Sequence, residues 1–174
     1  NRKATVRYKD ALDSLFLLDE VPAWLPFGSN LSRLGQAAKH HLADPALAAR
    51  LLGVSGAQLL RGDGNTLREG ALLGALFESL ATLSVRVYAD ACQAQTAHMR
   101  TRSGDREIDL IVTGEDGRIV AIEVKLAQVP DEHDLRHLNW LSTKLGDELA
   151  DMVVLTTGNH AYRRPDGIAV VPLA

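Results

Sequence analysis

The sequence predicts an α/β domain, and three features of its 174 residues support this prediction. The longest stretch with helical periodicity covers about residues 67–84, where leucines recur at helical spacing and form a broad apolar face. The pattern then changes to alternation in residues 106–112 and 119–125, which is typical of strands. A second helical stretch opens at Asp131, so helices and strands share one chain.

The two predicted strands are joined by a polar segment, residues 113–118, that contains the pair Asp116-Gly117. This pair predicts a hairpin, because both residue types tolerate the positive φ angles of a tight turn. Two apolar runs near the C-terminal end, residues 152–156 and 168–173, predict a strand buried on both faces and a final strand.

Shorter elements are predicted before the long helix. Residues 5–16 have the apolar spacing of a short amphipathic helix, and residues 17–21 predict a strand. Asp44-Pro45 is a capping residue followed by proline at the first helical position, which predicts a helix over residues 46–52.

The composition places the chain among globular proteins, with 46% hydrophobic and 24% charged residues. No stretch approaches the length of apolar sequence that crosses a bilayer, and no leader is evident, so we expect a cytoplasmic protein without a membrane partner. The net charge of −3 disfavours tight, nonspecific nucleic-acid binding over the whole surface. Cys92 is the single cysteine, which excludes an intrachain disulfide, and we expect it to be a small buried side chain.

The residues that carry chemistry lie in the second strand of the hairpin. Side chains two positions apart share one face of a strand, so Glu123 and Lys125 project together while apolar neighbours point the other way. Burial of a carboxylate in such a strand is costly unless it meets a cation, and a metal ion is one such partner. The alternative is a structural Glu123–Lys125 ion pair on an exposed strand face.

Asp109 lies in the first strand, and a hairpin closed by the Asp-Gly turn brings it opposite Glu123 or nearly so. Hard oxygen ligands hold Mg²⁺ or Mn²⁺, and we expect Asp109, Glu123 and the backbone carbonyl of Val124 to be the ligands. Such a metal polarises a phosphate and lowers the pKa of bound water. Lys125 is suited to orient that water or to stabilise developing charge.

Glu78 is a candidate to complete this site from the long helix. It lies in line with Ala71, Gly74 and Ala81, a stripe of small residues that allows the helix to approach the sheet closely. The alternative is a carboxylate on the solvent face of that helix.

These residues resemble the signature of PD-(D/E)XK phosphodiesterases, in which an aspartate and a Glu-x-Lys pair occupy adjacent strands. The matching segments are Glu78, residues 107–112 (Glu-Ile-Asp-Leu-Ile-Val) and residues 121–125 (Ala-Ile-Glu-Val-Lys). The resemblance implies a restriction-endonuclease-like fold, a mixed sheet flanked by helices. It also implies metal-binding and catalytic roles for Glu78, Asp109, Glu123 and Lys125.

More narrowly, the chain is similar to the C-terminal domain of a large group of prokaryotic AAA+-type ATPases. The similarity covers nearly the whole chain, through residues 8–12, Trp24, residues 43–47 and Phe77-Glu78. Members of this group carry a P-loop ATPase module first, a winged-helix-like segment next and the nuclease-like domain last. The resemblance therefore implies a winged-helix-like segment in residues 1–28 and a nuclease-like domain in residues 29–174.

The sequence begins at Asn1 rather than at methionine, so we expect a fragment of a longer protein with an upstream module. It contains no Gly-x-x-x-x-Gly-Lys-Ser/Thr loop, so ATP would bind only in that module.

Two further groups of residues have the chemistry of binding sites. Arg100, Arg102 and Arg106 precede the first strand of the hairpin and suit phosphate contacts with DNA, although a solvated loop explains them equally well. His133 and His137 have the spacing of zinc ligands on one helix, but no third ligand is evident, which favours two solvated or phosphate-facing histidines.

The sequence therefore favours a metal-dependent nuclease-like domain that acts on DNA or another phosphodiester and is coupled to an upstream ATPase. The alternative is a catalytically silent module that binds nucleic acid or a protein partner, or that regulates the ATPase. The complete set of acidic and lysine positions favours the first hypothesis.

Overall fold

The computed structural model describes residues 2–25, 34–35, 37–61 and 66–173. Its helices and strands follow one another along the chain as α1 (Arg2–Ser14), β1 (Leu18–Val21), β2 (Lys39–Leu42), α2 (Pro45–Leu51), α3 (Gly56–Arg61), α4 (Thr66–Ala91), β3 (Gln95–Arg100), β4 (Glu107–Thr113), β5 (Ile119–Val124), α5 (Glu132–Leu145), the 3-10 helix η1 (Gly146–Glu148), β6 (Leu149–Thr156), β7 (Tyr162–Arg163) and β8 (Ala169–Pro172).

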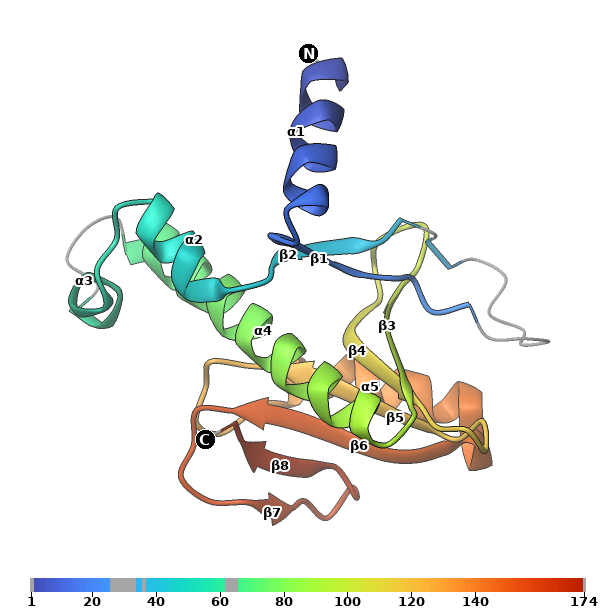
Figure 1. Cartoon of the computed structure of the whole chain (residues 1–174). Helices are drawn as coiled ribbons and strands as arrows, with labels where there is room; N and C mark the ends of the chain where they lie inside the picture. Colours follow the sequence, from blue (N-terminus) through green and yellow to red (C-terminus); the bar gives the residue numbers. More distant parts are fainter. Residues whose placement is uncertain (1, 26–33, 36, 62–65, 174) are drawn as a thin grey trace.

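The main sheet has six strands in the order β3-β4-β5-β6-β8-β7. The strands from β3 to β5 pair antiparallel, β5, β6 and β8 pair parallel, and β7 closes the far edge antiparallel to β8. This mixed sheet with helices on both faces confirms the predicted α/β class (Figure 1). A separate antiparallel pair, β1 with β2, lies beside it.

Two helices bury the two faces of the sheet. On one face, the leucines of α5, among them Leu135 and Leu138, form the larger core with Ile111 and Ala121 of the hairpin. On the other face, α4 contributes Ala81 to a second core that includes residues of β4, β5 and β6. These two layers fix the ends of the hairpin strands, where the predicted site lies.

The predicted hairpin is present and forms for the expected reason. Thr113 pairs with Ile119, and Gly117 has a φ of 78°, a conformation that few residues other than glycine adopt readily. The Asp116 side chain accepts a hydrogen bond from the backbone N–H of Arg118, which closes the turn locally.

Five of the described elements were not predicted from the sequence: β2, α3, β3, η1 and β7. The strand β3 is hidden because its polar and apolar residues do not alternate cleanly, and a register shift between Ala97 and Met99 interrupts its pairing with β4. The long helix was also predicted too short, since α4 continues beyond residue 84 to Ala91.

Two expectations from the sequence are wrong, one about the burial of Cys92 and one about the length of apolar segments. Cys92, expected to be buried, is exposed at the end of α4. A stretch of α4, Gly70–Ala91, is long and apolar enough to span a membrane by length and composition, contrary to the expectation. One such helix is weak evidence for a span, and both Glu78 and Arg86 within it form ion pairs with the β1–β2 segment.

The N-terminal helix α1 stands away from the main sheet and contacts β1 at its base (Figure 1). The boundary predicted between residues 28 and 29 lies outside the described residues, and the winged-helix-like assignment stays a prediction. The strand β1 pairs with β2 on the far side of that boundary.

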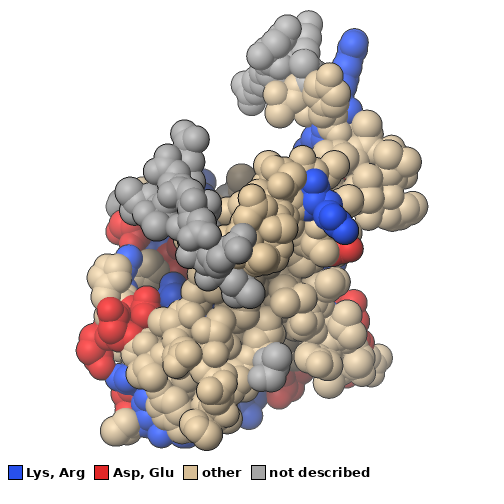
Figure 2. Space-filling model, turned by 90° about the vertical axis from the view of Figure 1, so that its left-hand side faces the viewer, with Lys and Arg blue, Asp and Glu red and all other residues tan. Residues whose placement is uncertain are grey.

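On the face shown in Figure 2, uncharged residues cover most of the area, and basic and acidic side chains lie close together near its lower edge. Among the described residues visible on this face, no broad basic area is present. This agrees with the net charge of −3.

Candidate functional site

The β4–β5 hairpin brings the predicted carboxylates together. Leu110 pairs with Ile122, so the next step of the same antiparallel register sets Asp109 opposite Glu123. Asp109 Oδ2 also accepts a hydrogen bond of 3.0 Å from the backbone N–H of Val124. The three residues expected to hold a metal therefore meet at one end of the sheet.

Glu123 is the most deeply buried charged residue of this group, with 3% of its surface exposed. Its Oε2 lies 3.0 Å from Nζ of Lys125, as the shared strand face predicted. Its Oε1 is buried and has no hydrogen-bond partner among the described residues, and the nearest nitrogen of His137 is 4.0 Å away. The exposed strand face proposed as the alternative is therefore wrong, although the ion pair itself is present.

The electrostatic environment favours a proton on Glu123 when no metal is bound. Burial and the neighbouring carboxylate of Asp109 raise the pKa of Glu123 to about 8, against the opposing effect of Lys125. Burial acts to lower the pKa of Lys125, but the neighbouring carboxylates, Glu123 first and then Asp109 and Asp134, together raise it. Lys125 therefore stays charged beside a carboxyl group that is costly to ionise.

Glu78 enters the site from α4. The small-residue stripe lies against the sheet in part: Ala81 is fully buried, and a Cβ added at Gly74 would meet the Leu126 side chain at 3.7 Å. Ala71 lies on an exposed part of the helix. The Glu78 carboxylate is part-exposed and contacts the Lys39 ammonium, which also lies 3.3 Å from Asp109 on the hairpin.

Two residues that the sequence did not single out complete the cluster. Lys39 on β2 has its Nζ 3.0 Å from Glu78, 2.8 Å from Glu107 and 3.3 Å from Asp109. Burial acts to lower the pKa of Lys39, but the surrounding carboxylates raise it well above its ordinary value. Glu107 had a usable signal, since it lies two positions before Asp109 on the same strand. Lys39 had none, because β2 was not predicted.

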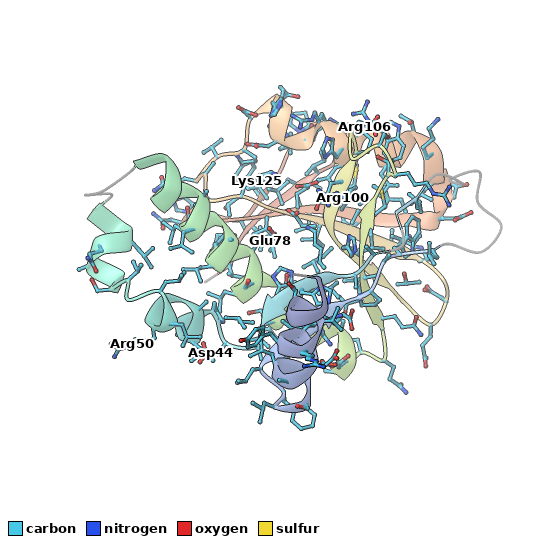
Figure 3. The ribbon with its side chains drawn as sticks, turned by 90° about the horizontal axis from the view of Figure 1, so that it is seen from above. Asp44, Arg50, Glu78, Arg100, Arg106 and Lys125 are labelled. Atoms are coloured by element: carbon cyan, nitrogen blue, oxygen red, sulfur yellow. The ribbon has the colours of Figure 1, made fainter. Side chains whose placement is uncertain are left out.

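The arginines that were predicted to contact DNA differ in exposure and in the groups that they contact. Arg100 pairs with Glu107 at 3.1 Å and is more than half exposed. Arg106 lies over the Trp140 ring, 5.7 Å from its centroid, and Arg102 is exposed. In Figure 3, Glu78, Arg100 and Lys125 lie around the middle of the view, whereas Arg50 on α2 and Asp44, which caps α2, lie apart from them.

Ring nitrogens of both histidines, His133 and His137, contact other groups of the described residues. The Nδ1 of His137 donates to the backbone carbonyl of Glu107 at 2.6 Å, and Arg136 contacts the ring nitrogens of both histidines. Burial lowers the pKa of His137, so its ring favours the neutral form. The hydrogen bond of His137 therefore holds α5 against the start of β4 and helps to position the site.

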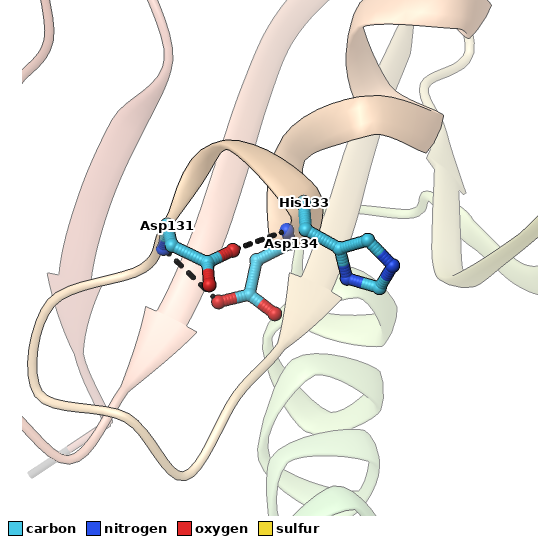
Figure 4. Close-up of side chains that lie close together, drawn as sticks. All are labelled: Asp131, His133 and Asp134. Atoms are coloured by element: carbon cyan, nitrogen blue, oxygen red, sulfur yellow. Dashed lines mark hydrogen bonds between the residues drawn. The ribbon is translucent and has the colours of Figure 1, made fainter.

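A second group with ligand-type atoms, Asp131, His133 and Asp134, lies at the start of α5 (Figure 4). Asp131 accepts a hydrogen bond from the Asp134 N–H at 2.9 Å, and the Asp134 carboxylate accepts one from the Asp131 N–H at 3.1 Å. These carboxylates form a capping box, so they serve the helix.

Comparison with known families identifies one match. The model of a family described as "Domain of unknown function (DUF4143)" matches residues 73–174, which is more than half of the chain and includes β4, β5, α5 and most of α4. Domains of this family associate with AAA ATPases. No curated protein and no solved structure matches the chain.

Proposed function

We propose that this chain, which belongs to the DUF4143 family, is a PD-(D/E)XK-type, metal-dependent nuclease-like domain that acts on DNA or another phosphodiester. The observation that carries the proposal is the orphaned Oε1 of Glu123, a buried carboxylate oxygen that lacks a hydrogen-bond partner among the described residues. Such an atom is costly to bury, and a divalent cation would satisfy it.

The donor set fits magnesium or manganese. Both ions prefer oxygen ligands, and Asp109, Glu123 and the Val124 carbonyl would supply them from adjacent strands. When bound, the ion would polarise a phosphate and lower the pKa of a bound water. The pKa of about 8 for Glu123 implies that metal binding competes with its proton near neutral pH.

Residues of the chain would orient the water, stabilise charge and contact the substrate. Lys125, held 3.0 Å from Glu123, would orient the attacking water or stabilise negative charge that develops on the phosphate. Glu78, on α4, would add negative charge to the site. The exposed guanidinium groups of Arg100 and Arg102 would contact the phosphate backbone beside it, together with Arg106.

The association of this family with AAA ATPases supports a coupled arrangement. In it, an upstream ATPase module of the full-length protein would bind ATP and present the substrate, and a cytoplasmic location would suit both modules. The winged-helix-like segment, residues 1–28, would connect the two.

A manganese titration followed by calorimetry tests the proposed site. We expect the wild type to bind one ion weakly, and Glu123→Gln to weaken that binding by at least about tenfold, since even residues behind the ligands commonly contribute that much. Glu115→Gln removes the same charge from an exposed position of the hairpin turn and should leave binding unchanged. Equal binding by the wild type and Glu123→Gln would refute the assignment.

One observation favours a second candidate function, a catalytically silent module that binds nucleic acid or a protein or regulates the ATPase. The ammonium of Lys39 already neutralises part of the carboxylate cluster, as a permanent structural ion pair would. A wild type that binds manganese and cleaves no DNA in its presence would favour this candidate.

A further inference from the structure

The geometry points to Lys39 as a built-in competitor of the metal. We propose that its ammonium group occupies the cation position of the carboxylate cluster, and that a divalent ion binds only by displacing it. This inference rests on the proposed function, because it concerns the regulation of that same site.

Lys39 contacts every carboxylate of the cluster except that of Glu123. Its Nζ lies within 3.3 Å of oxygens from Glu78, Glu107 and Asp109, which come from α4 and β4. A single ammonium that bridges acids from separate elements has the position and charge sign of a bound cation. Because Asp109 is both a contact of Lys39 and an expected metal ligand, the two cations compete for its carboxylate.

The position of Lys39 does not depend on its own ion pairs. The backbone of β2 is held by pairing with β1, in which Lys39 lies opposite Val21. The same segment is attached to α4 through His41 Nδ1 and Ser79 Oγ, 2.9 Å apart, and through the ion pair of Arg86 with Asp19. The ammonium is therefore delivered to the cluster by a fixed strand.

Displacement requires only a movement of the side chain. Lysine has a flexible four-carbon stem, and the Lys39 side chain is 19% exposed, so its end can rotate toward solvent while β2 stays in place. Metal binding and the Lys39 contact then weaken each other by the same factor. An interaction that holds Lys39 in the cluster lowers the affinity for the metal. A module that moves the β1–β2 segment would thereby control the site.

Manganese affinity measured by electron paramagnetic resonance tests this inference. We expect Lys39→Met to bind manganese about tenfold or more tightly than the wild type, a change within the usual range of coupling between sites. The matched control is Lys9→Met, which removes the same charge from an exposed pair between Lys9 and Glu20 and should leave the affinity unchanged. Lys39→Gln removes the charge but keeps a hydrogen-bond donor, and it serves as a second variant if Lys39→Met does not fold.

The outcomes separate this inference from the proposed function. Tighter binding in both Lys39 variants, with Lys9→Met unchanged, supports the competition. Equal or weaker binding in the Lys39 variants overturns it, while binding by the wild type leaves the metal site standing. An absence of manganese binding in the wild type and in every variant overturns both.

Discussion

At the residue scale, Glu123 determines how the metal-free site responds to pH. Its pKa is raised from 4.5 to about 8, chiefly by burial and secondly by Asp109. Between these pH values the folded chain holds a proton that the unfolded chain releases. The free energy of unfolding should therefore fall as pH rises through this window, since the native state binds more protons there.

Glu123→Gln removes this titration, so it should be more stable than the wild type at pH 8 and less distinct from it near pH 5. A difference between pKa values of 4.5 and about 8 corresponds to at most about 5 kcal/mol. Urea unfolding at several pH values measures the difference, and other titrating groups cancel in the comparison. A constant difference between the two proteins from pH 5 to pH 8 would contradict the account.

At the scale of single elements, α5 depends on its N-terminal capping box. The Asp131 carboxylate accepts a hydrogen bond from the Asp134 N–H, and the Asp131 N–H donates one to the Asp134 carboxylate. The helix carries Leu135 and Leu138 into the core. Asp131→Ala should destabilise the fold by about 1 kcal/mol, the usual cost of a lost cap. Thermal or urea unfolding measures it, with Asp10→Ala on the exposed face of α1 as the control. A loss no larger than the control's would show that the cap contributes nothing.

Elements with strong local signals could be predicted from the sequence, and others could not. The Asp116-Gly117 turn fixed the hairpin register that sets Asp109 opposite Glu123, because turn type and strand length are local properties. The strand β2 lacks a local signal, since it pairs with β1 across an intervening segment of the chain. The strand β3 pairs with the next strand, β4, but a register shift interrupts the pairing. Lys39 could not be predicted because β2 was not, although its ammonium contacts three carboxylates of the site.

Burial also depended on information that a sequence pattern does not contain. Alternation correctly paired Glu123 with Lys125, but it gave no measure of how deeply α5 covers them. Conversely, Cys92 follows a long apolar helix and looks like a core residue, yet it is exposed in the turn between α4 and β3. Depth in the core is set by how elements stack, which is a tertiary property.

At the scale of the whole molecule, charge limits what the isolated chain can do to DNA. Acidic residues outnumber basic ones, 22 to 19, and Arg100 near the site is already paired with Glu107. Tight binding to the DNA backbone needs several phosphate contacts. Under the proposed function, the associated ATPase would contribute part of that affinity.

We therefore expect the isolated chain to cleave DNA slowly, only with manganese or magnesium, and less as salt increases. A gel assay at low salt measures the cleavage, with Lys125→Ala as the inactive control. Rapid turnover at physiological salt would contradict the expected dependence on another module. Equal activity of the wild type and Lys125→Ala would assign the cleavage to a contaminating nuclease.

The exposed face of α4 is the other large-scale feature of the molecule. Leu80, Leu83, Val87 and Tyr88 are all exposed along this helix, although its opposite side packs on the sheet. Burial of such side chains is favourable, at about 25 cal/mol per Å². The same helix presents Glu78 to Lys39. A partner bound to the exposed face would therefore be separated from the candidate site only by the width of α4.

If Asp109 and Glu123 hold one divalent ion, diffraction from crystals soaked in manganese should locate it. We expect one anomalous peak within about 2.0–2.3 Å of an Asp109 oxygen and of Glu123 Oε1, distances typical of metal–oxygen ligation. We also expect the Lys39 ammonium to have moved away from Asp109. Manganese bound elsewhere on the molecule, with no anomalous density between these two carboxylates, would contradict the proposed site.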